Sequence, residues 1–119
     1  MGQGVLIDTD VLIDYVRGRR ELPEGLVLVS EATLYEFIRG TRDPAEAKRL
    51  LESQFVVVFS DNRVIELAAR IWRTLREGGQ PIEDRDLIIG ATAIALGVPL
   101  LTGNRKHFER LREFGLELL

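Results

Sequence analysis

Short, continuous runs of hydrophobic residues alternate with helix-like segments along this chain, and that alternation constrains the fold more than any other feature. Runs rich in β-branched residues are typical of strands that are buried on both faces of a sheet. Strands that alternate with helices predict a mostly parallel sheet between two layers of helices, which is a three-layer α/β/α sandwich. We expect strands at residues 5–7, 26–29, 55–59 and 99–102, and an edge strand at 116–119.

Capping residues and glycines mark where the intervening helices begin and end. Asp10 is expected to cap the first helix, Ser30 the second, Asp43 the third, and Asp61 a long fourth helix that ends at Gly78. The segment 86–96 is hydrophobic on almost every side, which predicts a central buried helix. The expected helices with definite bounds are 11–17, 31–39, 45–53, 86–96 and 106–112.

The composition excludes several classes of protein. A length of 119 residues fits a single domain over 1–119, with 45% hydrophobic and 29% charged residues, as in soluble globular proteins. The absence of cysteine excludes disulfides, zinc–thiolate sites and thiol nucleophiles, and the single histidine excludes a multi-histidine metal site. No hydrophobic run approaches the roughly 20 residues of a membrane span, so we expect a soluble, cytosolic protein.

The distribution of charge is more informative than the net charge of −3. Aspartates gather in two short stretches, around residues 8–14 and 84–86, whereas basic residues collect elsewhere. Concentrated acid beside separate basic patches suits a cation site that serves a polyanion, although an ordinary solvated surface explains any single basic pair equally well. The candidates for contact with the polyanion are Arg17, Arg39 and Arg105.

Three carboxylates stand out, and each also has a simpler explanation. Asp8 ends the first predicted strand, but an aspartate there could serve only as a turn or cap. Glu36 is flanked by hydrophobic residues and must be exposed, paired or coordinating; a salt bridge to Arg39 or Arg17 would satisfy it. Asp86 opens the most hydrophobic helix, where the helix dipole favours an acid.

Taken together, these carboxylates indicate a metal site. In a parallel sheet the carboxyl ends of the strands share one edge, and Asp8, Glu36 and Asp86 are all expected near it. Asp84 is expected to cap the helix, which leaves Asp86 free for another role. Asp10 could support the ligands without binding the ion itself. Hard cations such as Mg²⁺ or Mn²⁺ take oxygen ligands and can activate water against a phosphodiester.

Four motifs in this sequence resemble those of PIN-domain nucleases, most closely the VapC-type toxins of toxin–antitoxin pairs. The resemblance covers nearly the whole chain, and the motifs follow one another in family order. They are VLIDTDVLID at 5–14, SEATLYEFIRG at 30–40, PIEDRDLIIGATA at 81–93 and LTGNRKHF at 101–108.

The resemblance implies a metal-dependent endoribonuclease with Asp8, Glu36 and Asp86 as metal ligands or ligand-positioning acids. Asn104 falls at a fourth position where the wider family often has aspartate, and its amide offers a neutral oxygen instead. Thr9 and Thr102 would support the site through hydrogen bonds. The resemblance further implies an RNA substrate, a homodimer and a cognate antitoxin protein.

Two other functions remain open from the sequence. A haloacid-dehalogenase-like phosphatase would also begin with an Asp-Thr-Asp motif after a strand, but Leu12 stands where that chemistry wants threonine or valine. Alternatively, a PIN fold could be retained only to bind RNA or protein, because Asn104 departs from the full acidic quartet. Phosphatase assays and metal-dependent RNA cleavage would separate these functions.

Overall fold

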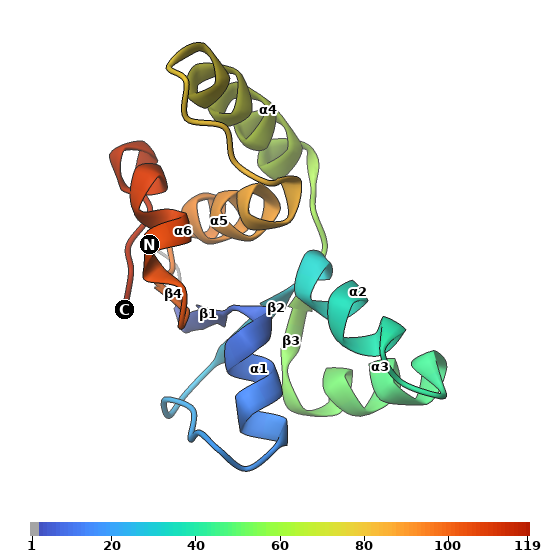
Figure 1. Cartoon of the computed structure of the whole chain (residues 1–119). Coiled ribbons are helices and arrows are strands. Elements are labelled where there is room, and N and C mark those ends of the chain that lie inside the picture. Colours follow the sequence, from blue (N-terminus) through green and yellow to red (C-terminus); the bar gives the residue numbers. More distant parts are fainter. Residues whose placement is uncertain (1–2) are drawn as a thin grey trace.

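A four-stranded parallel sheet forms the middle of the computed structural model, which describes residues 3–119 (Figure 1). The strands are β1 (Val5–Ile7), β2 (Val27–Ser30), β3 (Val56–Val58) and β4 (Leu100–Leu101), and they lie in the order β3-β2-β1-β4. All three pairings are parallel. The predicted parallel sheet is therefore confirmed, with β1 and β2 as its inner strands.

β1 covers its predicted run and β2 is shifted by one residue, whereas β3 and β4 are shorter than the hydrophobic runs that predicted them. The expected edge strand at 116–119 contributes only an isolated parallel bridge between Leu118 and Leu100. Backbone hydrogen bonds from the Leu100 N–H to the Glu117 carbonyl and from the Leu119 N–H to the Leu100 carbonyl hold this segment beside β4. Because β4 has only two residues, it offers too short an edge for a full fifth strand.

Helices cover both faces of the sheet, as the three-layer prediction requires. In Figure 1, α5 with α4 beyond it lies on one side of the strands, and α1 with α3 lies on the other. The second helix, α2, contacts α1, α3 and also α5. The helices are α1 (Thr9–Val16), α2 (Glu31–Arg39), α3 (Pro44–Gln54), α4 (Asn62–Glu77), α5 (Asp84–Leu96), α6 (Arg105–Phe108) and the 3-10 helix η1 (Glu109–Phe114).

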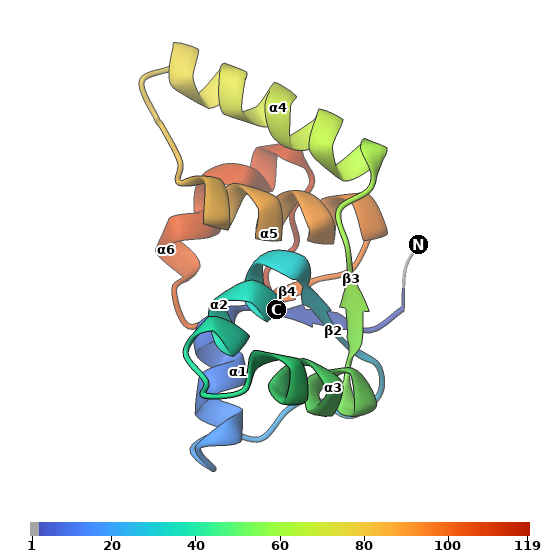
Figure 2. The ribbon, with the colours of Figure 1, turned by 90° about the vertical axis from the view of Figure 1, so that its right-hand side faces the viewer.

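Alternation along the strands divides the core into two halves. Successive side chains of a strand point to opposite faces of a sheet. Leu6 and Leu28 accordingly pack with the buried side chains of α4 and α5, whereas Ile7 and Val29 pack with those of α1 and α3. The view in Figure 2 shows the resulting layers, with the sheet between α5 and the pair α1 and α3.

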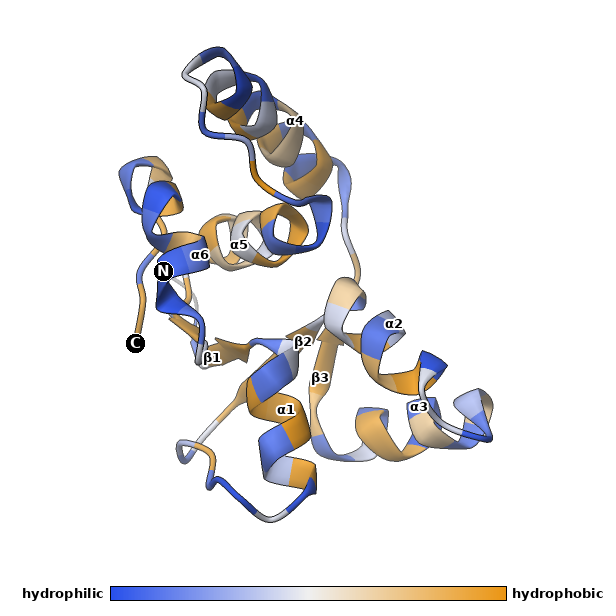
Figure 3. Ribbon diagram, viewed as in Figure 1, coloured by the Kyte–Doolittle hydropathy of each residue, from blue (hydrophilic) through white to orange (hydrophobic). Residues whose placement is uncertain are grey.

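The predicted central helix is confirmed as α5, which is buried along most of its length. It is hydrophobic through most of its turns, whereas α4 presents hydrophilic residues outward (Figure 3). Gly90 in α5 allows η1 to approach, because a Cβ atom there would lie 2.3 Å from the Leu111 Cδ1 atom. The face of α4 that packs on α5 consists of Val64, Ala68, Ile71 and Leu75.

Two of the predicted capping residues are wrong. The N-cap of α1 is Asp8, not Asp10, because the helix begins directly after β1 and the Asp8 carboxylate accepts the Thr9 N–H at 2.7 Å. The N-cap of α5 is Glu83, and Asp84 is the first residue inside the helix. In both places several acids stand close together, and local sequence does not say which of them adopts the extended backbone of a cap.

The last predicted helix is also corrected. The segment that was expected as one helix over 106–112 is a short α-helix, α6, that continues as the 3-10 helix η1 up to Phe114. Phe108 and Leu111 in this segment are both fully buried. Within residues 3–119, no helix combines the length and hydrophobicity needed to cross a membrane.

Candidate active site

The candidate site lies at the carboxyl edge of the sheet, where the strand order changes direction. The chain leaves β1 for β2 on one side and returns much later to β4 on the other side. Such a switch point is where parallel α/β sheets commonly bind ligands. Asp8 directly follows β1, Ser30 ends β2, and Thr102 directly follows β4.

Asp8 is a fully buried carboxylate whose two oxygens are both bonded. Oδ1 accepts the Thr9 N–H at 2.7 Å and the Arg85 Nη2 at 2.8 Å. Oδ2 accepts the Thr102 hydroxyl, also at 2.8 Å. A buried charge is costly unless it is paired and hydrogen-bonded, and these donors meet that requirement.

Glu36 points from α2 toward Asp8 and is partly buried. Its Oε1 accepts the Thr9 hydroxyl at 2.6 Å and the Arg85 Nε at 2.6 Å. Thr33 supports the same corner, because its hydroxyl lies 3.1 Å from that of Thr9. Arg39 lies only at the outer limit of an ion pair with Glu36, at 4.0 Å, so a simple surface salt bridge does not explain this acid.

Asp86 comes from the first turn of α5 and is buried at the opposite side of the cluster. It pairs with Arg85, and its Oδ2 lies 3.5 Å from the His107 Nδ1. Burial raises the pKa of Asp86, and the charge of Asp8 adds to this effect, whereas Arg85 and His107 counteract it. Asp86 is therefore an acid whose charged form depends on a neighbouring cation.

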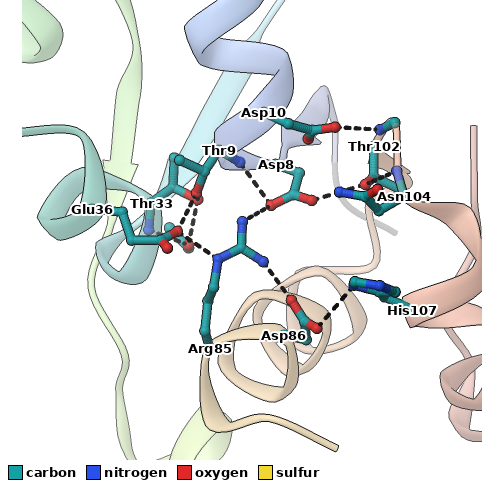
Figure 4. Close-up of polar contacts among 12 residues, drawn as sticks. Asp8, Thr9, Asp10, Thr33, Glu36, Arg85, Asp86, Thr102, Asn104 and His107 are labelled. Carbon is teal, nitrogen blue, oxygen red and sulfur yellow. Dashed lines mark hydrogen bonds and ion pairs between the residues drawn. The ribbon is translucent and has the colours of Figure 1, made fainter.

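Arg85 lies at the centre of the cluster and pairs with all three acids (Figure 4). Its Nε contacts Glu36, its Nη1 contacts Asp86 and its Nη2 contacts Asp8. Partial burial lowers the pKa of Arg85, but the three carboxylates outweigh burial and raise that pKa above its ordinary value. The acids thus converge on one positive group.

A hydrogen bond joins Asp10 to the loop after β4. The Asp10 Oδ2 accepts the Gly103 N–H at 3.0 Å, whereas Oδ1 is buried without a hydrogen-bond partner among the described residues. Burial raises the pKa of Asp10, and the neighbouring charge of Asp8 raises it further. A Cβ atom on Gly103 would lie 2.4 Å from the Asp10 Oδ2, so a larger residue there would displace this carboxylate.

Other predicted site residues lie farther from this cluster. Asn104 is exposed at the start of α6; its N–H donates to the Thr102 hydroxyl, but its side chain makes no capping bond. Asp84 is exposed and lines a surface hollow with Trp72, so it neither caps α5 nor joins the acids in the described structure. The basic candidates Arg17, Arg39 and Arg105 are all exposed, and Arg105 donates to the Leu119 carbonyl.

The cluster fits a divalent cation in its chemistry. Carboxylate oxygens from Asp8, Glu36 and Asp86 already surround one cationic group, the guanidinium of Arg85. Oxygen ligands of this kind suit hard divalent ions, which usually keep several waters. As the side chains stand in residues 3–119, however, no three acids or histidines are placed to hold one ion together.

The family of the chain follows from its match to a family model. The model of the PIN domain matches residues 5–113, which includes every element from β1 to most of η1. This chain belongs to the PIN-domain family. The predicted resemblance is confirmed, and the family match favours it over the phosphatase alternative.

Similar proteins agree with the PIN-domain assignment. Ribonuclease VapC1 of Methanocaldococcus jannaschii is 41% identical over 116 residues, which covers 96% of this chain and 85% of that protein. A toxin–antitoxin complex from Klebsiella pneumoniae contains a chain that is 26% identical, with a TM-score of 0.70 over 87% of this chain and 89% of that one. VapBC-1 from nontypeable Haemophilus influenzae is 23% identical and shows the same fold, with a TM-score of 0.81 over 98% and 97% of the two chains.

Sequence reasoning missed three residues of this PIN-domain site. Arg85 was available as a signal, because it is a basic residue between two acids at the mouth of a buried helix. His107, the single histidine, was not among the predicted site residues, yet it lies beside Asp86. Thr33 gave no signal beyond its position in the second helix, since its contact with Thr9 joins two separate elements.

Proposed function

We propose that this PIN-domain chain is a VapC-type ribonuclease, the toxin of a toxin–antitoxin pair, and that it hydrolyses RNA with Mg²⁺ or Mn²⁺. The observation that carries the proposal is the convergence of Asp8, Glu36 and Asp86 on one cationic group at the carboxyl edge of the sheet. The 41% identity to a protein named Ribonuclease VapC1 supports the same activity.

The residues of the chain divide the work of the proposed site. Asp8, Glu36 and Asp86 would hold the ion, and the hydroxyls of Thr102 and Thr9 would keep Asp8 and Glu36 oriented. When bound, a divalent ion supplies positive charge for the developing charge on the phosphodiester and activates a water molecule. Because Asp8 is fully buried, it can fix one side of the ion while water and RNA approach from the other side.

The proposed partners follow from relatives rather than from contacts in this chain. A similar chain forms a toxin–antitoxin complex in Klebsiella pneumoniae, and we propose an antitoxin partner here by that likeness. Homodimer formation, a cytosolic location and a single domain over the whole chain stay predictions. The same holds for RNA contact by Arg17, Arg39 and Arg105, all of which are exposed and so accessible to a polyanion.

Metal-dependent cleavage of RNA by the purified protein tests the proposed function. We expect cleavage with Mg²⁺ or Mn²⁺ and none after chelation with EDTA. Asp8→Asn, Glu36→Gln and Asp86→Asn should each remove most of the activity, because each replaces a charged ligand with a neutral one. Cleavage that persists in EDTA would contradict the metal mechanism.

Asp14→Asn is the matched control for these substitutions. Asp14 lies on α1 close to Asp8 in sequence, but its side chain makes no ion pair or hydrogen bond within the described part of the chain. We expect this variant to keep wild-type activity.

If purified wild-type protein binds RNA without cleaving it under any of these conditions, a PIN fold retained for binding is the better explanation.

A further inference from the structure

Arg85 is the feature of this site that the proposed function does not use. Its guanidinium occupies the point at which the three acids meet, with Nε 2.6 Å from Glu36 and Nη2 2.8 Å from Asp8. Its third nitrogen group pairs with Asp86. One side chain therefore engages the whole proposed ligand set with three different atoms.

We propose that Arg85 is a tethered counter-ion that competes with the divalent metal for Asp8, Glu36 and Asp86. In this proposal the metal-free protein is held closed by Arg85, and metal binds only when the arginine side chain swings away. The inference rests on the proposed function, because it concerns control of that same site. It adds a self-inhibiting contact within the chain.

The metal-free protein needs a cation at this point, which explains why Arg85 stays there. Asp8 is fully buried, and Asp86 is buried beside it, so both would be destabilised without a positive partner. A guanidinium presents its donors in a rigid planar fork and suits several carboxylates at once. Charge-assisted bonds of this type are about twice as strong as neutral ones.

Arg85 is also placed so that it can leave. Its side chain is 29% exposed, more than any of the three acids that it bridges. It is the second residue of α5, whose N-cap Glu83 makes no side-chain capping bond. Rotation of the side chain alone would carry the guanidinium into solvent, without movement of the buried strands.

Charge favours the metal once it is available. Arg85 brings one positive charge to three carboxylates, whereas a divalent ion brings two charges to the same oxygens. The described acids do not hold an ion together as they stand, and the guanidinium lies between them. Removing the arginine would let the three side chains close around a smaller cation.

A purely structural role for Arg85 predicts the opposite result. If Arg85 only positions Glu36 and Asp86, its loss would disorder those acids and weaken metal binding. If Arg85 competes with the metal, its loss would strengthen metal binding. The direction of the change in affinity therefore separates the two roles.

Calorimetric titration with Mn²⁺, in the absence of RNA, measures that direction. We expect Arg85→Gln to bind Mn²⁺ more tightly than wild type, with a Kd lower on the order of tenfold or more. Arg85→Lys keeps the charge but lacks the fork, so its affinity should fall between the two. An Arg85→Gln affinity equal to or weaker than wild type would overturn the proposal.

Arg49→Gln is the matched control, because Arg49 is an exposed arginine on α3 that pairs with Glu46 and with none of the three acids. Its Mn²⁺ affinity should stay at the wild-type value.

Should Arg85→Gln fail to fold without metal, the Arg85→Lys titration decides the question in its place. A Kd for Arg85→Lys at or above that of wild type would then count against competition.

The wild-type protein offers a test that needs no folded variant. In the NMR spectrum of ¹⁵N-labelled protein, the Nε–H signal of Arg85 should be protected from exchange without metal, because it donates to Glu36. Saturating Mg²⁺ should move this signal to the position and exchange rate of an exposed arginine. A signal that keeps its position and protection would refute the swing of Arg85.

These readouts are independent of RNA cleavage. If the affinity and NMR results hold but no RNA is cleaved, the proposed ribonuclease activity fails while the competition stands. If RNA is cleaved with metal but Arg85→Gln binds Mn²⁺ no better than wild type, the competition fails while the ribonuclease activity stands.

Discussion

A substitution of Thr102 tests how the side chains of the site are held in place. Thr102 donates to the Asp8 Oδ2 at 2.8 Å and accepts the Asn104 N–H at 2.9 Å. Thr102→Val keeps the shape of the side chain but removes both bonds. Within residues 3–119 the structure gives that Asp8 oxygen no other hydrogen-bond donor, so the carboxylate loses its support on one side.

The expected cost follows from the charge and burial of Asp8. A hydrogen bond to a charged group contributes about 1.5–3 kcal/mol, and Asp8 is fully buried, so solvent cannot replace the lost donor. Asn104 is an exposed residue, so its N–H can turn to water at little cost. We therefore expect Thr102→Val to destabilise the metal-free protein by about 2 kcal/mol, which lowers the Tm by roughly 8 °C for a chain of this size.

Thermal unfolding in EDTA measures this effect, with Thr92→Val as the control. Thr92 is also buried, but its hydroxyl donates at 2.7 Å to the Ile88 carbonyl in α5 and touches no acid. Its loss should cost less than about 1 kcal/mol, because a bond between neutral groups is weaker. If Thr102→Val melts at the same temperature as Thr92→Val, the hydroxyl does not support Asp8 as the structure implies.

Two further predictions concern the same edge of the sheet, and a third concerns Gly4, which precedes β1 at the opposite edge. Asp10→Asn should raise the Tm of the metal-free protein by on the order of a few degrees. Burial and the charge of Asp8 raise the pKa of Asp10 and so disfavour its charged form, which asparagine does not have. A lower Tm would contradict this reasoning. Asn104→Asp should tighten Mn²⁺ binding in calorimetry, since cation affinity rises with ligand charge; identical isotherms would exclude a metal role at this position. Gly4→Ala should lower the free energy of unfolding by about 1–3 kcal/mol in urea denaturation. The reason is that Gly4 has a φ of 96° and that a Cβ atom there would lie 2.6 Å from the Leu26 carbonyl oxygen. An unchanged urea midpoint would contradict this strain.

The fold could be predicted because its signals are local. Hydrophobic runs and capping residues each span only a few positions, and parallel strands must end at one edge. That geometry is enough to place Asp8, Glu36 and Asp86 near one another before any contact is known. Their roles as ligands stay predictions that the proposed substitutions test.

The contacts of Arg85 could not be predicted in the same way. Its partners Glu36 and Asp8 are 49 and 77 residues away in sequence, so the ion pairs exist only after the helices dock on the sheet. The predicted N-caps of α1 and α5 were wrong for a related reason. Asp8 and Asp10 are both good capping residues, and only the lack of a loop between β1 and α1 decides for Asp8.

That direct junction between β1 and α1 has a consequence for how the site opens. The Asp8 N–H is bonded to the Leu101 carbonyl at 2.9 Å, and the Asp8 carbonyl accepts the Leu12 N–H at 3.1 Å, so this acid shares the hydrogen bonds of the sheet and the helix. Amides here should exchange with deuterium only when the whole protein unfolds, whereas those at the start of α5 should exchange through local fraying. The side of the site that carries Asp8 is thus as stable as the core, whereas the side formed by the start of α5 can unfold locally.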